Sequence, residues 1–331
     1  MKFMKHFIIL TILVIICTSG CGRISEPVTE TGFYLDTVVQ ITLYDTDGRD
    51  ACIEKIQECF EIVDRYEHMF SATIEDSDVW NINHSGGSPV SVSEDTISLL
   101  QTALFYSELS DGRVDVTVLP LSELWNFGSE GNSRKPNDID IQEAVSHIDY
   151  HAVSISGNSV TLSDSEAAID LGFIAKGYIA DRLKEYLLEQ GATSACINLG
   201  GNLITIGNKP DGHPFRIGIQ KPFGYEGEII TAIDVTDSSV VSSGVYERYF
   251  YEDDVLYHHL LDTSTGYPAD NTIAGVTILT PSSVDADALS TTCFFLGLDA
   301  GMELIESLDD TEVLFITMEG ELHHSDGFPL Q

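Results

Sequence analysis

The chain is poor in basic residues. Its 331 residues include 16 Lys and Arg against 53 Asp and Glu, which gives a formal net charge of −37 at pH 7. A surface with this excess of carboxylates repels nucleic acid and anionic lipid headgroups, so DNA and RNA are disfavoured as partners. It also repels a polyanionic nucleotide, so a phosphate-binding site on this protein would need a metal ion.

Cysteine patterns typical of disulfide frameworks and zinc sites are also missing. The four cysteines that follow Cys21 contain no C-x-x-C pair and no Cys/His metal spacing. Cys52 and Cys59 fall on one predicted helix, about 10 Å apart along its axis, too far to bridge each other. We interpret all four as small buried apolar residues.

The common catalytic signatures are absent as well. The sequence has no Walker A loop, no H-E-x-x-H, no G-x-S-x-G and no Rossmann glycine fingerprint. It has no internal repeat and, after Thr31, no low-complexity linker. With 43% apolar residues, the chain can bury a substantial core in one large domain or two closely packed lobes.

The N-terminal residues 1–21 predict an export signal. Two lysines precede the apolar run Phe7–Ile16, which is too short to span a bilayer. The small residues of Thr18–Cys21 resemble a bacterial lipobox, in which Cys21 would be lipidated, although Thr18 stands where Leu is usual. Plain secretion with cleavage near Gly20 is the alternative.

The sequence therefore divides into three parts. We expect residues 1–21 to be the signal, residues 22–32 to be a polar tether, and residues 33–331 to form a single domain. The protein would then be exported and anchored to the outer face of the cytoplasmic membrane through Cys21.

Hydrophobic periodicity predicts an α+β fold. Helices are expected near 52–63, 94–109, 174–187 and 285–296, with another after Asp299. Strands are expected at 33–44, in a hairpin at 152–162, in several short segments between 195 and 261, and at 312–318. Strands grouped in hairpins with helices between the groups favour mostly antiparallel sheets with flanking helices over a doubly wound parallel sheet.

The segment Ile169–Arg182 is the most informative one. Asp170, Gly172 and Lys176 come immediately before an apolar run with helical spacing. A helix start offers free backbone N–H groups and a positive dipole end, which suit an anionic group. The alternative is an ordinary strand, turn and helix with a solvated Lys176.

A second candidate lies near the C-terminus. Asp287 and Thr291 are four residues apart, so on a helix their oxygens face the same side. A carboxylate and a hydroxyl are hard ligands suited to Mg²⁺, which shares its coordination shell with water and substrate phosphates. The alternative is an amphipathic helix whose Asp favours the N-terminal dipole.

Several loops of small residues could also contribute. His259 opens a strand that ends in the turn Asp262–Gly266, whose hydroxyl and N–H groups could cradle phosphate or form only an Asx-type turn. The loops Ser242–Arg248 and Asn198–Asn202, and the acidic turn 111–117, are weak signals individually.

Together these segments, in this order, resemble the ApbE-like FAD:protein FMN transferases, which are exported and usually lipid-anchored bacterial proteins. The resemblance runs from about Phe33 to Gly297. It is carried by L-D-T-V-V-Q-I-T-L-Y, S-x-x-x-x-D-S-D-V-x-x-I-N, D-V-T-V-x-P-L-x-x-L-W, I-D-L-G-x-I-A-K-G-Y, N-L-G-G-N, S-S-G-x-Y-E-R, H-x-L-D-x-x-T-G-Y-P and D-A-L-S-T.

The resemblance implies a T-fold-related α+β domain that binds FAD with Mg²⁺ on its diphosphate. A Thr hydroxyl of a partner protein attacks the FMN phosphorus and AMP leaves. The implied metal ligands are Asp287, Ser290, Thr291 and the carbonyl of Phe173, and the implied catalytic residues are Asp287 and His259. The implied FAD-binding residues are Leu35, Thr73, Arg113, Val114, Asp115, Asp170, Lys176, Gly201, Ser243, His259 and Leu261.

Two departures from the family pattern leave alternatives open. Family members often have Met-Gly where this chain has Leu35 and Asp36, and many have an aromatic residue where it has Thr73. A smaller side chain there would admit water to the phosphorus and favour hydrolysis of FAD to FMN and AMP. A flavin-binding lipoprotein without catalysis is a third hypothesis.

The sequence contains no S-G-A-T or T-G-A-T segment that could serve as an acceptor site of its own. The resemblance implies that the acceptor is a separate exported protein with an S/T-G-A-T-like motif, such as a subunit of a redox pump or reductase.

Overall fold

A computed structural model of the chain describes residues 26–44, 48–127, 133–225 and 227–330. The predicted export signal at 1–21, including the lipidation site, lies outside the described residues, as does the start of the predicted tether. Among the residues that are described, no helix is long and apolar enough to cross a bilayer.

The centre of the fold is an eight-stranded sheet in which every neighbouring pair is antiparallel. The strands, in sheet order, are β1 (Val28–Tyr34), β2 (Thr37–Leu43), β6 (Ala195–Leu199), β7 (Asn202–Ile206), β10 (Ser239–Gly244), β13 (Ile273–Thr280), β14 (Glu312–Thr317) and β15 (Leu322–His324). This arrangement confirms the predicted α+β class with mostly antiparallel sheets.

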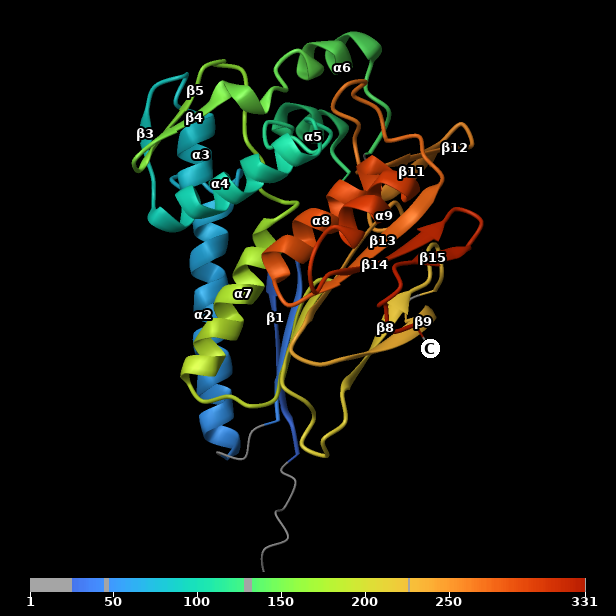
Figure 1. The fold of residues 1–331 in the computed structure, drawn as a ribbon. Helices are drawn as coiled ribbons and strands as arrows, with labels where there is room; N and C mark the ends of the chain where they lie inside the picture. The colour runs from blue at the N-terminus through green and yellow to red at the C-terminus, as the bar shows by residue number, and fades with distance from the viewer. Residues whose placement is uncertain (1–25, 45–47, 128–132, 226, 331) are drawn as a thin grey trace, which may run out of the picture.

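Long helices cover one face of this sheet (Figure 1). They are α2 (Arg49–Phe70), α7 (Ala175–Glu189), α8 (Ser283–Leu296) and the shorter α9 (Leu298–Glu306). Strand residues alternate between the two faces: Val241 and Phe315 join the core under the helices, whereas Val240 and Leu314 face the other side. That other side is covered by the hairpin of β8 (Phe215–Gln220) and β9 (Ile229–Val235).

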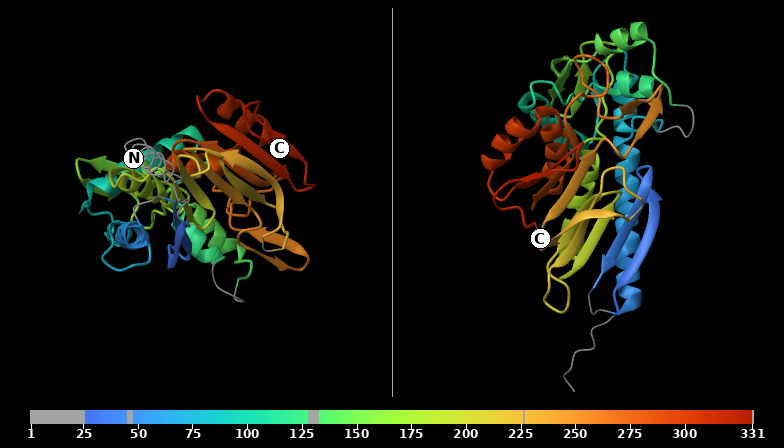
Figure 2. Two further views of the ribbon diagram at one scale, coloured as in Figure 1. Left: turned by 90° about the horizontal axis from the view of Figure 1, so that it is seen from below. Right: turned by 90° about the vertical axis from the view of Figure 1, so that its right-hand side faces the viewer.

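The remaining elements gather at one end of the sheet (Figures 1 and 2). They are α3 (Asp78–Asn83), β3 (Val90–Ser91), α4 (Glu94–Leu109), α5 (Leu119–Trp125), α6 (Asp138–Val145), the 3₁₀ turn η1 (Tyr150–Ala152), β4 (Val153–Ser156), β5 (Ser159–Leu162), β11 (Tyr249–Glu252) and β12 (Val255–His258). Trp125 is buried at the centre of a separate apolar cluster there, and its indole N–H donates to the Gly266 carbonyl at 2.8 Å. This cluster holds α5 and the β11–β12 hairpin beside the main sheet.

The expected helices form where local signals placed them. Ser93 caps α4 by accepting a bond from the Thr96 N–H at 3.1 Å, and Ser282 accepts from the Asp285 N–H at the start of α8. Of the body cysteines, Cys52, Cys59 and Cys293 are buried as expected, but Cys196 is only half-buried.

The N-terminal strand differs from the prediction. Residues 33–44 do not form one strand, because Leu35 and Asp36 both have a φ of 55° and make a two-residue hairpin turn between β1 and β2. In place of a tether, residues 28–32 belong to β1 and pair with β2. The folded domain therefore begins by Val28 rather than at residue 33.

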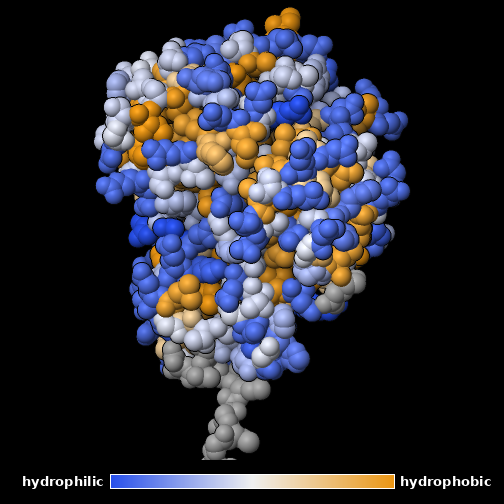
Figure 3. All heavy atoms as spheres, viewed as in Figure 1, coloured by the Kyte–Doolittle hydropathy of each residue, from blue (hydrophilic) through white to orange (hydrophobic). Residues whose placement is uncertain are grey.

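Hydrophilic side chains cover most of the face in Figure 3, with apolar residues in patches between them.

Candidate functional site

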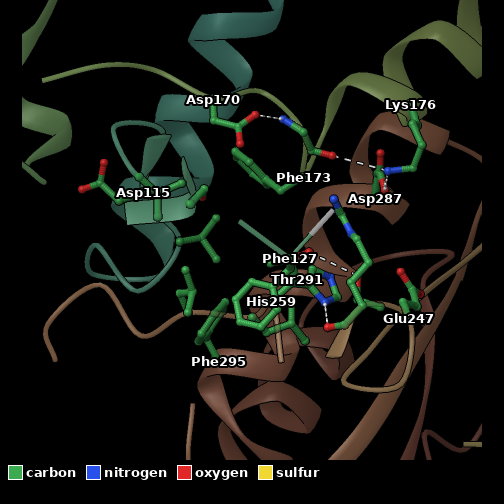
Figure 4. A pocket seen from close by; sticks show the side chains of 18 of the residues that line it. Asp115, Phe127, Asp170, Phe173, Lys176, Glu247, His259, Asp287, Thr291 and Phe295 are labelled. Atoms are coloured by element: carbon green, nitrogen blue, oxygen red, sulfur yellow. Dashed lines mark hydrogen bonds and ion pairs between the residues drawn. The ribbon is translucent and has the colours of Figure 1, made fainter. Parts of the chain in front are cut away.

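A pocket of about 350 Å³ lies where the elements gathered at one end of the eight-stranded sheet meet that sheet. Its walls come from the loop before α7, from α5 and α8, from the ends of β10 and β12, and from the turn between β6 and β7. Most of the predicted site residues line it, namely Arg113, Val114, Asp115, Asp170, Phe173, Lys176, Ser243, His259, Leu261, Asp287 and Thr291. Segments that are up to about half the chain apart in sequence thus meet in one cavity (Figure 4).

Asp287 is the most enclosed acid of the pocket. Its side chain is 5% exposed and lies 3.9 Å from the Lys176 ammonium, and its Oδ2 accepts a bond from the Gly177 N–H at 2.8 Å. Burial raises the pKa of this carboxyl, although Lys176, the Gly177 N–H and the Asn202 amide act to lower it. A cation beside Asp287 would offset the cost of burying its charge.

Thr291 presents a hydroxyl one turn further along α8. Its Oγ1 lies 3.2 Å from the hydroxyl of Ser243 at the end of β10. Ser290 is turned away from the cavity: its hydroxyl donates to the Asp287 carbonyl at 2.8 Å and lies 2.7 Å from Ser243 Oγ. Ser243 therefore fixes the Thr291 hydroxyl, and Ser290 supports this arrangement from behind.

These oxygens suit a divalent cation that keeps part of its shell open. Among the described residues, no group of three or more His, Cys, Asp or Glu side chains converges as a metal cage would require. Asp287 and Thr291 offer one carboxylate and one hydroxyl, and Phe173 also borders the pocket. Mg²⁺ is commonly held by one or two carboxylates plus water and substrate phosphate, so the donor set fits Mg²⁺.

The turn before α7 is built by Asp170. Its Oδ1 accepts from the Gly172 N–H at 2.8 Å, and its own N–H donates to the Val116 carbonyl at 2.7 Å. The Lys176 ammonium lies 3.4 Å from the Gly172 carbonyl. Lys176 therefore points into the pocket rather than into bulk solvent.

Hydrogen bonds to the backbone hold the side chains of Asp115 and Arg113 in the pocket wall. The Asp115 carboxylate accepts from the Thr117 N–H at 2.8 Å and from the Tyr150 N–H at 2.9 Å, and burial raises its pKa. The Arg113 guanidinium donates to the Phe295 carbonyl at 3.0 Å, which ties the turn to the end of α8.

His259 follows β12 and faces the pocket. Its Nδ1 lies 3.3 Å from the Arg248 carbonyl. Since a carbonyl only accepts, Nδ1 carries the proton and Nε2 is left with a lone pair. Burial, with the positive charge of Arg248, lowers the pKa of His259 to about 3, so the ring is neutral at pH 7.

Glu247 and Arg248 are pocket residues that sequence reasoning missed. Their loop was noticed for its small residues, but nothing local distinguished these charged side chains from solvated ones. Although Glu247 has accessible surface, the surrounding walls remove much of its hydration, and this raises its pKa to about 7.

The turn that follows Leu261 does not form a phosphate cradle. The Asp262 carboxylate accepts from the Ser264 N–H at 2.8 Å and from the Thr265 N–H at 3.1 Å. These N–H groups are already bonded, so the alternative of an Asx-type turn is correct.

Four predicted site residues do not line the pocket. Leu35 sits in the β1–β2 turn, where its N–H donates to Glu67 Oε1 at 2.9 Å, and Thr73 is exposed after α2, 3.1 Å from the Ser71 hydroxyl. The Gly201 N–H is bonded to Asn198 Oδ1 at 2.9 Å, and Ser290 is fully buried. At the connection between β6 and β7, Gly200 of the turn and Asn202 at the start of β7 line the pocket, and Gly201 does not.

Comparison with known proteins gives consistent matches over nearly the whole chain. The profile of the ApbE family matches residues 35–315. A relative from Klebsiella pneumoniae (strain 342), named FAD:protein FMN transferase, is 36% identical over 266 residues, which cover 80% of this chain and 82% of the relative. A relative of the same name from Treponema pallidum (strain Nichols) is 31% identical and covers 96% of this chain and 92% of its own length. The crystal structure of the ApbE protein from Thermotoga maritima superimposes with a TM-score of 0.83 at 34% identity, covering 91% of this chain and 97% of that chain.

Proposed function

This chain belongs to the ApbE family, and from that membership we propose that it is an FAD:protein FMN transferase, which moves FMN from FAD to an acceptor protein. The observation that carries the proposal is the pairing of Asp287 and Thr291 on one face of α8, inside the pocket described above and beside Lys176. That site can hold a diphosphate together with a cation on a protein that is otherwise strongly acidic.

The two ends of the pocket differ in chemistry (Figure 4). Lys176, Asp287 and Glu247 lie on one side, and Phe295 lies toward the opposite side, which Asp115 also borders. Lys176, helix N–H groups and a cation bound beside Asp287 would suit the diphosphate, whereas aromatic side chains suit a flat heterocycle. A dinucleotide with a ring system at one end matches this division.

We propose Mg²⁺ as the cation, held by Asp287, Thr291 and the Phe173 carbonyl. When bound there, Mg²⁺ would neutralise diphosphate charge and make the phosphorus more electrophilic. Lys176 adds positive charge at the same end of the pocket. Ser243 keeps the Thr291 hydroxyl in place.

The chemical step needs a base for the acceptor. The Thr hydroxyl oxygen of the acceptor forms a bond to the FMN phosphorus, the bond from that phosphorus to the bridging oxygen breaks, and AMP leaves with that oxygen. His259 is neutral and carries a lone pair on Nε2, so it can take the hydroxyl proton. Positioning and charge neutralisation supply most of the catalysis in such transfers, so a weak base is sufficient.

We also propose that the protein is exported and lipid-anchored through Cys21, outside the cytoplasmic membrane. The signal-like segment 1–21 and its lipobox-like end support this. Metabolic labelling with an alkyne fatty acid tests it, since Cys21→Ser would lose the label while the wild type keeps it.

The enzymatic proposal is tested by incubating the protein with FAD and Mg²⁺ and measuring the AMP released from FAD. The acceptor is a purified protein domain with an exposed Ser-Gly-Ala-Thr segment, and its matched control has that Thr replaced by Ala. We expect AMP and covalent flavin only with the Thr-containing domain. AMP without any acceptor would identify an FAD pyrophosphatase, and no AMP with either domain would leave a flavin-binding protein.

A substitution at Asp287 tests the assignment of the metal site. Asp287→Ala removes the carboxylate from the pocket, so we expect loss of at least about 100-fold in turnover with an unchanged far-UV circular dichroism spectrum. Turnover equal to that of the wild type would refute the role of Asp287.

A further inference from the structure

Exposed aromatic side chains form a row beside the pocket. Phe223 lies in the loop between β8 and β9, Tyr249 and Tyr251 lie on β11, and their exposed fractions are 40%, 42% and 62%. The ring centroids are 5.4 Å apart between Phe223 and Tyr249 and 5.9 Å apart between Tyr249 and Tyr251, and both pairs meet edge to face. The proposed chemistry uses none of these three rings, which we call the aromatic row.

The aromatic row begins at the pocket. Phe223 also contacts Tyr246, with the ring centroids 6.3 Å apart, and Tyr246 is buried directly before the pocket residue Glu247. Tyr249 directly follows Arg248, another residue of the pocket wall. The row therefore extends from the pocket wall onto the outer surface.

Both ends of the β11–β12 hairpin are fixed at the pocket. Arg248 precedes β11 and His259 follows β12, and both line the pocket. The His259 N–H donates to the Arg248 carbonyl at 3.1 Å. An acceptor whose hydroxyl reaches His259 must therefore pass beside this hairpin.

The two faces of the hairpin have different surroundings. Phe250 and Tyr257 pack against the cluster of Trp125. Because side chains alternate along a strand, Tyr249 and Tyr251 lie on the opposite face, and the hairpin reaches the outer edge of the molecule (Figure 1). The fold thus buries one set of rings and leaves the other set available to a partner.

Phe223 is held in an unfavourable backbone conformation. Its φ is 55°, which a bulky residue adopts rarely because its side chain crowds the backbone. Strain of this kind is concentrated at binding and catalytic sites, where the surrounding structure fixes it. At Phe223 the strained turn places an apolar ring on the surface, where its burial contributes little to folding.

The charge at the outer end of the row is negative. Asp253 and Asp254 form the turn between β11 and β12 and are both exposed. Lys221, in the loop of Phe223, is paired with Glu228 at 2.7 Å. Such a surface repels anionic lipid headgroups and attracts basic side chains of a protein.

The length of the row matches a protein acceptor rather than a small molecule. A strand rises about 3.3 Å per residue, so Tyr251 lies about 10 Å along β11 from Arg248. An extended chain covers that distance in about three residues. When the acceptor Thr is in the pocket, the residues about three positions away from it can lie on the aromatic row.

We propose that the aromatic row is the docking surface for the acceptor protein, and that basic side chains of the acceptor face Asp253 and Asp254. The inference rests on the proposed transfer of FMN to a protein. Exposed Tyr and Phe side chains are the residue types that supply most of the binding energy in protein–protein interfaces.

Binding of an unreactive acceptor tests the docking without any chemistry. The acceptor domain with Ala in place of the Thr of its Ser-Gly-Ala-Thr segment is titrated into the protein by calorimetry. We expect Tyr251→Ala to weaken binding about 10-fold or more. Tyr251→Phe keeps the ring and should stay within about 2-fold of the wild type.

A kinetic measurement separates docking from damage to the active site. At saturating FAD and Mg²⁺, the KM for the Thr-containing domain should rise by the same factor in Tyr251→Ala. Turnover at saturating acceptor and the KM for FAD should stay within about 2-fold of the wild type, because Tyr251 does not line the pocket.

Phe105→Ala is the matched control. Phe105 is a 56% exposed aromatic residue on α4, and among the described residues it belongs neither to the pocket wall nor to the aromatic row. Its variant should bind and use the acceptor as the wild type does.

Two versions of the acceptor domain test the charge. One has Lys and the other has Glu five residues to either side of the reactive Thr. The wild type should have the lower KM for the Lys version, and the double variant Asp253→Asn with Asp254→Asn should lose this preference. An equal preference in both proteins would refute the role of the two carboxylates.

The remaining outcomes are distinguishable. Acceptor affinity and KM in Tyr251→Ala equal to those of Phe105→Ala would overturn the inference while transfer by the wild type still stands. If Tyr251→Ala loses binding to phosphatidylglycerol vesicles with its acceptor affinity unchanged, the row contacts the membrane and the inference is wrong. If the wild type transfers no FMN, the proposed function fails, and binding of the unreactive domain still decides whether the row docks a protein.

Discussion

Four titratable side chains in the pocket, those of Asp115, Asp287, Glu247 and His259, have pKa values shifted toward their neutral forms. Between the pocket walls, the pKa of His259 falls to about 3 and that of Glu247 rises to about 7. Both shifts follow from loss of hydration, which disfavours the charged form of each group. The pocket therefore carries less negative charge near neutral pH than its carboxylates alone would suggest, which favours a phosphate-bearing substrate.

The raised pKa of Glu247 makes stability depend on pH. Its ordinary value is 4.5 and its folded value is about 7, so between these the folded protein binds more protons than the unfolded chain and stability falls as pH rises. The contribution is fully present below about pH 4.5 and lost above about pH 7. We expect Glu247→Gln to melt at a higher temperature than the wild type at pH 8 and at the same temperature at pH 4.5, by differential scanning calorimetry.

Glu319→Gln is the control for this measurement, because Glu319 is exposed in the turn after β14. Like Glu247→Gln, the substitution Glu319→Gln removes one negative charge from the protein. An equal gain at pH 8 in both variants would show that the effect is one of net charge rather than of the lost hydration of Glu247 in the pocket.

At the scale of elements, the crossing of α7 and α8 sets the geometry of the site. A Cβ on Gly177 would lie 2.2 Å from the Ser283 carbonyl oxygen, so only glycine allows the two backbones this close. The Asp181 carboxylate of α7 accepts from the Ser283 and Val284 N–H groups, both at 2.9 Å, and so caps α8 from outside. These contacts place Asp287 against the start of α7.

Gly177→Ala tests this crossing. The methyl group meets backbone that cannot rotate away, so we expect the free energy of unfolding to fall by about 1–3 kcal/mol, together with loss of transferase activity as the Gly177 N–H moves from Asp287. Urea denaturation measures the first effect and AMP release the second.

Gly191→Ala provides a matched comparison. Gly191 has a φ of +79°, and an added Cβ there would meet nothing within 4 Å. It should cost only the strain of a left-handed backbone, about 1–2 kcal/mol, and leave activity intact. Full activity in Gly177→Ala would contradict the argument that close approach of α7 and α8 orients the site.

At the scale of the whole molecule, the net charge of −37 affects the stability of the folded state. Like charges on one compact surface repel each other and destabilise the folded state, and salt screens this repulsion over about 10 Å at 0.1 M. We expect the melting temperature at pH 8 to rise as NaCl increases from about 20 mM to about 200 mM, a range over which the screening length shortens severalfold.

The same titration at pH 5 is the control. Carboxylates begin to take up protons there, so the repulsion and the gain from salt should both shrink. A gain of equal size at both pH values would indicate an effect of salt unrelated to charge.

Local sequence determined the parts of this protein that depend on near neighbours along the chain. Ser93 and Ser282 mark the starts of α4 and α8 because a cap acts within one turn. Asp287 and Thr291 share a helix face because of helical geometry alone. The order of the motifs along the chain was enough to indicate the family, whose profile matches residues 35–315.

Only the tertiary structure decided which of these groups meet. Lys176 approaches Asp287, and Glu247 enters the same pocket, through contacts between segments far apart in sequence. Leu35 and Asp36 break the predicted strand at a turn where the Leu35 N–H bonds to Glu67, 32 positions away. Spacing along the chain sets helix faces and caps, but which faces come together depends on the burial of a common core, and no local pattern contains that information.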